Sequence, residues 1–180
     1  LLVIDEAYGE FADHPNERCF DMVQTGNTVV LRTLSKAYGM AGFRVGWGLF
    51  PPQIAQHLRK VMNPNNVAAP SQAAATAALQ DHAYMRETCV LTAQIRDTVA
   101  RQIRAMGLHV YPSFTNFVLI DFRSPQRAAA VDQQLQNQGI FLRGQAGAGL
   151  SHCLRMTIGP ANDVEAALRA LEGLIHEGQT

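Results

Sequence analysis

Short apolar runs separated by polar segments mark the first fifty positions of the chain. Leu1–Ile4, Thr28–Leu31 and Val45–Phe50 are rich in branched or aromatic side chains. Runs of this kind predict strands of a mostly parallel sheet that is covered on both faces. Leu1–Ile4 has the pattern of a fully buried strand, which needs neighbours on both sides. We therefore expect the chain to be the downstream part of a longer protein.

Helical spacing dominates the next stretch. Apolar residues recur at steps of three and four after the third strand, and this predicts a helix that ends before Asn63-Pro64. The Ala-rich segment Ser71–Leu79 predicts a second helix. A third and longer helix is predicted from His82 to Met106, because its apolar positions keep the same steps until Gly107 ends it.

Beyond Gly107 the pattern becomes a mixture of short strands and helices. We expect strands at Leu108–Tyr111, Asn116–Phe122, Ile140–Leu142 and Leu154–Thr157, and helices at Pro125–Gln138 and Asp163–His176. The chain is therefore predicted to be an α/β protein with two parts. Residues 1–81 would belong to a larger domain with a mixed or parallel sheet, and residues 82–180 would form a smaller α+β domain.

Composition narrows the classes of protein. The 180 residues carry 15 Lys and Arg against 15 Asp and Glu, and 47% are hydrophobic. This balance favours a packed core and argues against a nucleic-acid or anionic-membrane surface. Three cysteines without a C-x-x-C pair predict a reducing, cytoplasmic environment. The six histidines lack i, i+4 pairing, so we expect no metal site.

Candidate chemical groups follow two of the predicted strands. Lys36 lies in the loop beyond the second strand and is one of only two lysines, the other being Lys60. Asp5 ends the first strand, and Tyr8 comes three residues later. Open α/β sheets bind ligands at the carboxyl ends of their strands. Arg44 lies between Gly42 and Gly46, which would let an anion approach the backbone.

These residues carry a resemblance to a known family. Asp5-Glu6-Ala7-Tyr8, Ser35-Lys36 and Gly42-x-Arg44-x-Gly46 resemble the cofactor-binding segments of fold-type I, pyridoxal-phosphate-dependent aminotransferases. The longer string Leu31–Tyr38, together with Phe141-Leu142-Arg143 and Cys153–Gly159, looks like the histidinol-phosphate aminotransferase branch. The resemblance extends over the whole chain.

The resemblance implies a role for each matching residue. Lys36 would condense with the aldehyde of pyridoxal 5'-phosphate (PLP) and later act as the base that moves the substrate proton. Asp5 would pair with the pyridine nitrogen, and Tyr8 would bond to the phenolic oxygen of the ring. The cofactor phosphate would be held by Thr33, Ser35 and Arg44.

For the substrate, the resemblance points to two arginines. Arg143 and Arg155 would bind the phosphate of the amine substrate, and Arg155 would also bind the glutamate carboxylate in the other half-reaction with the 2-oxo acid. The implied reaction is transamination between histidinol phosphate and 2-oxoglutarate in histidine biosynthesis, carried out by a homodimer. Two other reactions stay open within the same fold: decarboxylation of threonine phosphate and transamination of aromatic amino acids.

Two further expectations follow. Members of the family are about twice as long, and the upstream phosphate loop, the stacking aromatic residue and the upstream asparagine are not among these residues. We therefore expect the 180 residues alone to bind PLP weakly or not at all, and this leaves their own activity open. A rival interpretation takes Leu1–Ala7 as the Walker B strand of an ATPase, but no G-x-x-x-x-G-K-[ST] loop accompanies it.

Overall fold

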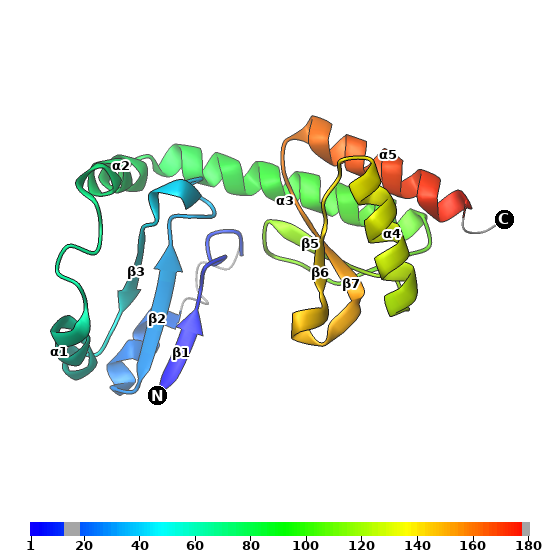
Figure 1. The fold of residues 1–180 in the computed structure, drawn as a ribbon. Helices are drawn as coiled ribbons and strands as arrows, with labels where there is room; N and C mark the ends of the chain where they lie inside the picture. Colours follow the sequence, from blue (N-terminus) through cyan, green and yellow to red (C-terminus); the bar gives the residue numbers. More distant parts are fainter. Residues whose placement is uncertain (13–18, 178–180) are drawn as a thin grey trace. The chain divides into compact units, whose positions relative to one another are not determined.

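The computed structural model describes residues 1–12 and 19–177 (Figure 1). The chain divides into two compact units, unit 1 (Leu1–Val90) and unit 2 (Leu91–Thr180). The break expected near residue 81 coincides with the junction between α2 (Ala69–Gln80) and α3 (His82–Ala105), whereas the units divide further on, inside α3. The first turns of α3 belong to unit 1 because they line a cavity there together with the loop that follows β1 (Leu2–Asp5).

Unit 1 contains a three-stranded sheet in the order β1-β2-β3. Its other elements are η1 (Cys19–Thr25), β2 (Thr28–Thr33), η2 (Ala41–Phe43), β3 (Gly46–Leu49) and α1 (Pro52–Val61). β1 and β2 run parallel, and β3 pairs with β2 in the antiparallel direction. All three predicted strands are thus confirmed, and the sheet is mixed.

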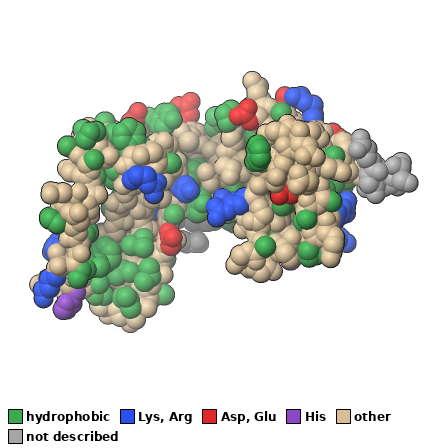
Figure 2. Space-filling view, viewed as in Figure 1, with side chains coloured by type: hydrophobic (Ala, Val, Ile, Leu, Met, Phe, Trp, Pro, Cys, Tyr) green, Lys and Arg blue, Asp and Glu red, His purple; other side chains and the backbone are tan. Residues whose placement is uncertain are grey.

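The prediction that the first strand is fully buried is wrong for the described chain. Leu1, Leu2 and Val3 expose 81%, 45% and 52% of their surface. The physical reason is that β1 is an edge strand, which pairs with β2 on one side only. Figure 2 shows hydrophobic side chains gathered over this end of the sheet. Trp47 and Leu49 of β3, the opposite edge strand, are also exposed, at 39% and 38%.

The predicted helices of unit 1 are confirmed. α1 begins at Pro52, a position at which the missing N–H of proline costs no helical hydrogen bond. Its last turn is closed by the hydrogen bond from the Met62 N–H to the Leu58 carbonyl. α2 buries Ala75, which packs with Leu34 in a small apolar cluster. No helix in residues 1–12 and 19–177 is long and apolar enough to cross a membrane.

Unit 2 contains a four-stranded antiparallel sheet in the order β4-β5-β7-β6. Its elements after α3 are β4 (His109–Val110), β5 (Phe117–Asp121), α4 (Pro125–Asn137), β6 (Arg143–Gln145), η3 (Ala146–Ala148), β7 (Leu150–Thr157) and α5 (Ala161–Glu177). One large apolar cluster unites its sheet with α3, α4 and α5. Val118, Ile120 and Phe122 are at most 1% exposed at its centre.

One predicted strand of unit 2 is displaced. The segment Ile140–Leu142 lies outside the sheet, and β6 begins at Arg143 instead. The Ile140 N–H bonds to the Leu135 carbonyl, so Ile140 still closes the end of α4. Ile140 and Leu142 pack against the core from a loop. Their apolar character therefore reflects burial and not strand pairing.

Candidate active site

Two parallel strands end at the same edge of the unit 1 sheet (Figure 1). Asp5, the last residue of β1, is in register with Leu31 of β2, and the Glu6 N–H donates to the Leu31 carbonyl at 2.9 Å. Thr33 ends β2 on the same side. The parallel pairing therefore brings the loop with Tyr8 and the loop with Lys36 to one edge, as the sequence predicts.

Lys36 lies against an aromatic side chain at this edge. Its Nζ atom is 5.3 Å from the centre of the Tyr8 ring, a cation–π contact. The lysine is half-buried, and within the described residues no carboxylate forms an ion pair with it. The amine is thus close to a phenol, and no carboxylate of the described chain is paired with it.

Two hydroxyl groups meet directly before Lys36. The Thr33 and Ser35 hydroxyl oxygens are 2.9 Å apart, and the Ser35 N–H donates to Thr33 Oγ1 at 3.1 Å. The carbonyl of Val45 accepts from the Leu34 N–H at 3.1 Å. This bond draws the segment that follows Arg44 to the same turn. The Ser35 hydroxyl accepts from Thr33 and keeps its own O–H, which can donate to an anion.

Arg44 occupies a backbone conformation that favours glycine. Its φ is 56°, in the left-handed region, which costs a residue with a Cβ atom about 1 kcal/mol. Its exposed guanidinium donates to the Ala41 carbonyl at 2.7 Å. On the β3 side, a Cβ atom at Gly46 would lie only 2.8 Å from the Arg32 carbonyl, so the close pairing of β2 and β3 requires glycine there.

A buried ion-pair network supports this edge from the neighbouring strand. Arg32 of β2 is 7% exposed and binds two carboxylates, those of Glu6 and Glu10. Its Nε atom donates to Glu6 Oε2 at 2.8 Å, and its Nη1 atom to Glu10 Oε1 at 2.7 Å. Because both acids flank Tyr8 in the loop after β1, the network fixes that loop on β2.

The network also shifts pKa values. Burial alone would raise the pKa of Glu6, but the Cys19 N–H and the Arg32 guanidinium outweigh it and hold the pKa below its ordinary value. Burial alone would lower the pKa of Arg32, yet the bonds from Glu10 and Glu6 raise it. The sequence analysis missed this network. An arginine inside an apolar strand was the signal for it, because such a charge needs buried partners.

The two predicted substrate arginines lie together in unit 2. Arg143 of β6 and Arg155 of β7 are direct cross-strand partners, so they are on the same face of the sheet. The Arg155 guanidinium is 4.8 Å from the centre of the Phe117 ring, and its buried Nε has no hydrogen-bond partner. Neither arginine forms an ion pair within the described residues. Two positively charged side chains thus lie on one face of the sheet, and an anion bound between them would offset their repulsion.

Comparison with known proteins identifies the class. The family model "Aminotransferase class I and II" matches residues 1–171, and the chain belongs to this family of enzymes. Its fold is part of the fold-type I, PLP-dependent aminotransferase fold.

Within the family, the chain is similar to histidinol-phosphate aminotransferases. It is 39% identical to the one from Rhodospirillum centenum over 175 residues, which are 95% of this chain and 48% of the relative. The one from Granulibacter bethesdensis is 37% identical, with 97% and 48% covered. The structure of the Sinorhizobium meliloti enzyme in complex with pyridoxal-5'-phosphate superimposes with a TM-score of 0.92 at 35% identity, covering 98% of this chain and 49% of that one. The chain thus spans about half the length of the relatives it matches.

Proposed function

We propose that this chain provides the lysine-bearing part of a PLP-dependent aminotransferase that converts histidinol phosphate with 2-oxoglutarate as the amino acceptor. The observation that carries the proposal is the position of Lys36 Nζ over the Tyr8 ring at the edge where β1 and β2 end. The similarity to histidinol-phosphate aminotransferases supports the choice of substrate. The proposal includes a cytoplasmic homodimer that serves histidine biosynthesis.

The groups at this edge suit PLP chemically. A planar pyridine ring that carries an aldehyde, a phenolic oxygen and a phosphate needs an amine, hydrogen-bonding partners for its ring atoms and donors for its phosphate. Lys36 supplies the amine, Asp5 at the end of β1 supplies a carboxylate, and Tyr8 in the loop that follows supplies a phenol. The Thr33–Ser35 hydroxyl pair and Arg44 supply donors for the phosphate.

Three of these residues have a role in the proposed reaction. When bound, PLP supplies an aldehyde for the substrate amine and a ring that takes up the electron pair of the breaking Cα–H bond. Lys36 Nζ would act as the base that takes the proton from the substrate Cα and holds it for its return. The Asp5 carboxylate would pair with the pyridine nitrogen of PLP and keep it protonated, and the Tyr8 hydroxyl would donate to the phenolic oxygen of the ring.

Arg143 and Arg155 are the proposed anion-binding residues. The two arginines are cross-strand partners, neither forms an ion pair with a carboxylate of the described chain, and a phosphate or carboxylate would give the buried Arg155 Nε a hydrogen-bond partner. A guanidinium binds either anion through two parallel hydrogen bonds, so one pair of arginines can serve the phosphorylated amine and the 2-oxo acid in turn.

The test replaces the matching stretch of the Rhodospirillum centenum relative by this chain and assays the chimera, after its visible spectrum has shown bound PLP. With histidinol phosphate and 2-oxoglutarate we expect glutamate. The chimera with Lys36→Ala should form none, and the matched control Lys60→Ala should stay active, because Lys60 is exposed on α1. A chimera that binds PLP but forms no glutamate, or that releases carbon dioxide from threonine phosphate instead, would contradict the proposal.

A further inference from the structure

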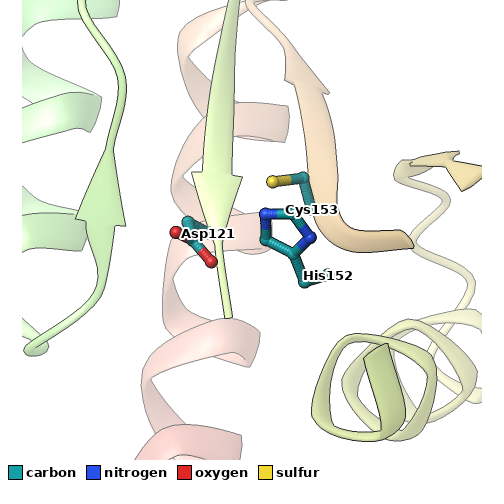
Figure 3. A group of neighbouring side chains, drawn as sticks. All are labelled: Asp121, His152 and Cys153. Atoms are coloured by element: carbon teal, nitrogen blue, oxygen red, sulfur yellow. The ribbon is translucent and has the colours of Figure 1, made fainter. Parts of the chain in front are cut away.

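Three side chains with metal-binding atoms meet in unit 2, and none of them has a role in the site described above (Figure 3). Asp121 is the last residue of β5, and His152 and Cys153 lie in β7. One carboxylate oxygen, one imidazole nitrogen and the thiol sulfur all lie within 4.8 Å of one another. Asp121 and Cys153 are direct cross-strand partners, so the register of the sheet sets their spacing.

The carboxylate in this cluster is already oriented. Asp121 Oδ1 accepts from the Arg123 N–H at 2.6 Å, and Oδ2 accepts from the Tyr111 hydroxyl at 3.4 Å. In contrast, no hydrogen bond within the described residues involves the His152 imidazole or the Cys153 thiol. Hydrogen bonds of this kind orient ligating carboxylates in metal sites, and the imidazole and the thiol are not hydrogen-bonded to other protein groups of the described chain.

The three ligand types select the metal. Nitrogen, sulfur and oxygen together suit a borderline ion such as Zn²⁺, whereas Mg²⁺ and Ca²⁺ prefer oxygen alone. A thiolate and a carboxylate carry two negative charges and would neutralise a divalent ion. Neutrality matters here because Cys153 is 0% exposed, and an uncompensated charge at such a position is costly.

The required rearrangement is small. Ligand atoms around tetrahedral zinc are about 3.5 Å apart, since the bonds are about 2.0–2.3 Å long. The side chains must therefore close by about 1 Å through rotation of their χ angles. His109 faces Asp121 from β4, but its ring packs edge-on against Tyr111 at 4.7 Å, so the fourth position is left for water.

We propose that Asp121, His152 and Cys153 bind a zinc-class divalent cation, with water as the fourth ligand. The sequence predicts no metal site because its histidines lack helical spacing, whereas these ligands come together only across two strands. The site has no part in the proposed aminotransferase reaction. A bound ion would link the end of β5 to β7, two residues before Arg155, and would stabilise unit 2 against unfolding.

The test titrates Zn²⁺ and Co²⁺ into the metal-free 180-residue chain, with a coloured chelator as competitor. We expect one equivalent to bind, a higher melting temperature with zinc, and a sulfur-to-cobalt absorption band. His152→Gln and Asp121→Asn should each weaken binding by about tenfold or more. Cys153→Ser should remove the absorption band. Mg²⁺ should not compete.

Matched controls separate ligation from general damage. His109→Gln and Cys89→Ser change the same residue types outside the cluster and should bind zinc like the unchanged chain. Circular dichroism without metal shows which variants fold. If Cys153→Ser does not fold, the half-buried His152 and Asp121 variants decide the question. The proposal is overturned if the unchanged chain does not bind zinc, or if His152→Gln and Asp121→Asn both bind it with unchanged affinity.

Discussion

The two units differ in how their sheets are covered. In unit 2, strands and helices bury their apolar side chains in one continuous cluster. In unit 1, the buried cluster consists of Leu34, Met40 and Ala75, while Val3 on β1 and Trp47 on β3 are exposed. Unit 1 nevertheless carries the candidate catalytic lysine. Its local order at that edge comes from polar contacts: the Arg32 ion-pair network and the hydroxyl turn before Lys36.

The two units are therefore stabilised by different interactions. Apolar burial stabilises unit 2 and is insensitive to pH, because the hydrophobic effect involves no charge. The Tyr8 loop in unit 1 depends on two carboxylates and one guanidinium, so its stability depends on their protonation. Substitutions in the two units should therefore respond to different conditions.

The largest effect is expected in the core of unit 2. Phe122→Ala removes a ring that is 0% exposed and should lower the free energy of unfolding by about 3–5 kcal/mol. The contrasting change Val3→Ala, at an exposed position, should cost about 0.5 kcal/mol or less. Urea unfolding, monitored by hydrogen exchange, measures the free energy of unfolding of both variants. An equal cost for the two substitutions would show that β1 is as well covered as unit 2.

A comparable effect by a different mechanism is expected in unit 1. Arg32→Met leaves the carboxylates of Glu6 and Glu10 buried without their cation and should destabilise unit 1 by about 3 kcal/mol. Trp47, the one tryptophan of the chain, is the cross-strand neighbour of Arg32, so its fluorescence reports this loss directly. Arg59→Met, at an exposed position on α1, serves as the control and should leave the unfolding curve unchanged.

The stability of unit 1 should also depend on pH, unlike that of the apolar core of unit 2. Glu6 has a pKa below its ordinary value in the folded chain, so its charge contributes stability above that ordinary value. This contribution is lost as the pH falls through the lowered pKa. Unit 1 should therefore weaken in acid, and Glu6→Gln should show a smaller loss between neutral and acid pH. Identical pH profiles for the two proteins would mean that Glu6 is not held by Arg32.

The smallest predicted effect has the opposite sign. Arg143→Gln removes one of two facing positive charges and should stabilise unit 2 by about 0.2–1 kcal/mol in low salt. Added phosphate should raise the melting temperature of the unchanged chain more than that of the variant. If phosphate stabilises both proteins equally, the two arginines do not form an anion site.

The sequence predicts the elements that depend on local pattern. The apolar spacing of α1, α3 and α4 and the apolar runs of β1 and β2 are confirmed, because each pattern lies within one element. The parallel pairing of β1 and β2 then places Asp5 and Lys36 at one edge, and this follows from strand direction alone.

Features that depend on distant partners were missed. Ile140 and Leu142 have the apolar character of a strand, yet they pack from a loop, because burial and strand pairing favour the same residue types. The Arg32 network and the Asp121–Cys153 pair join residues far apart in the chain, and only the folded structure brings them together. The exposure of Leu1 and Val3 could not be predicted either, because it depends on which strands are present beside β1.

The reactivity of Lys36 is the claim on which the functional proposal depends most. The direct measurement incubates the chimera with the Rhodospirillum centenum relative, described above, with PLP, reduces it with borohydride and maps the modified lysine by mass spectrometry. The account predicts an adduct on Lys36 in large excess over Lys60, although Lys60 is the more exposed of the two lysines. Modification of Lys60 to an equal or greater extent would show that exposure alone governs the reaction, and it would contradict the account.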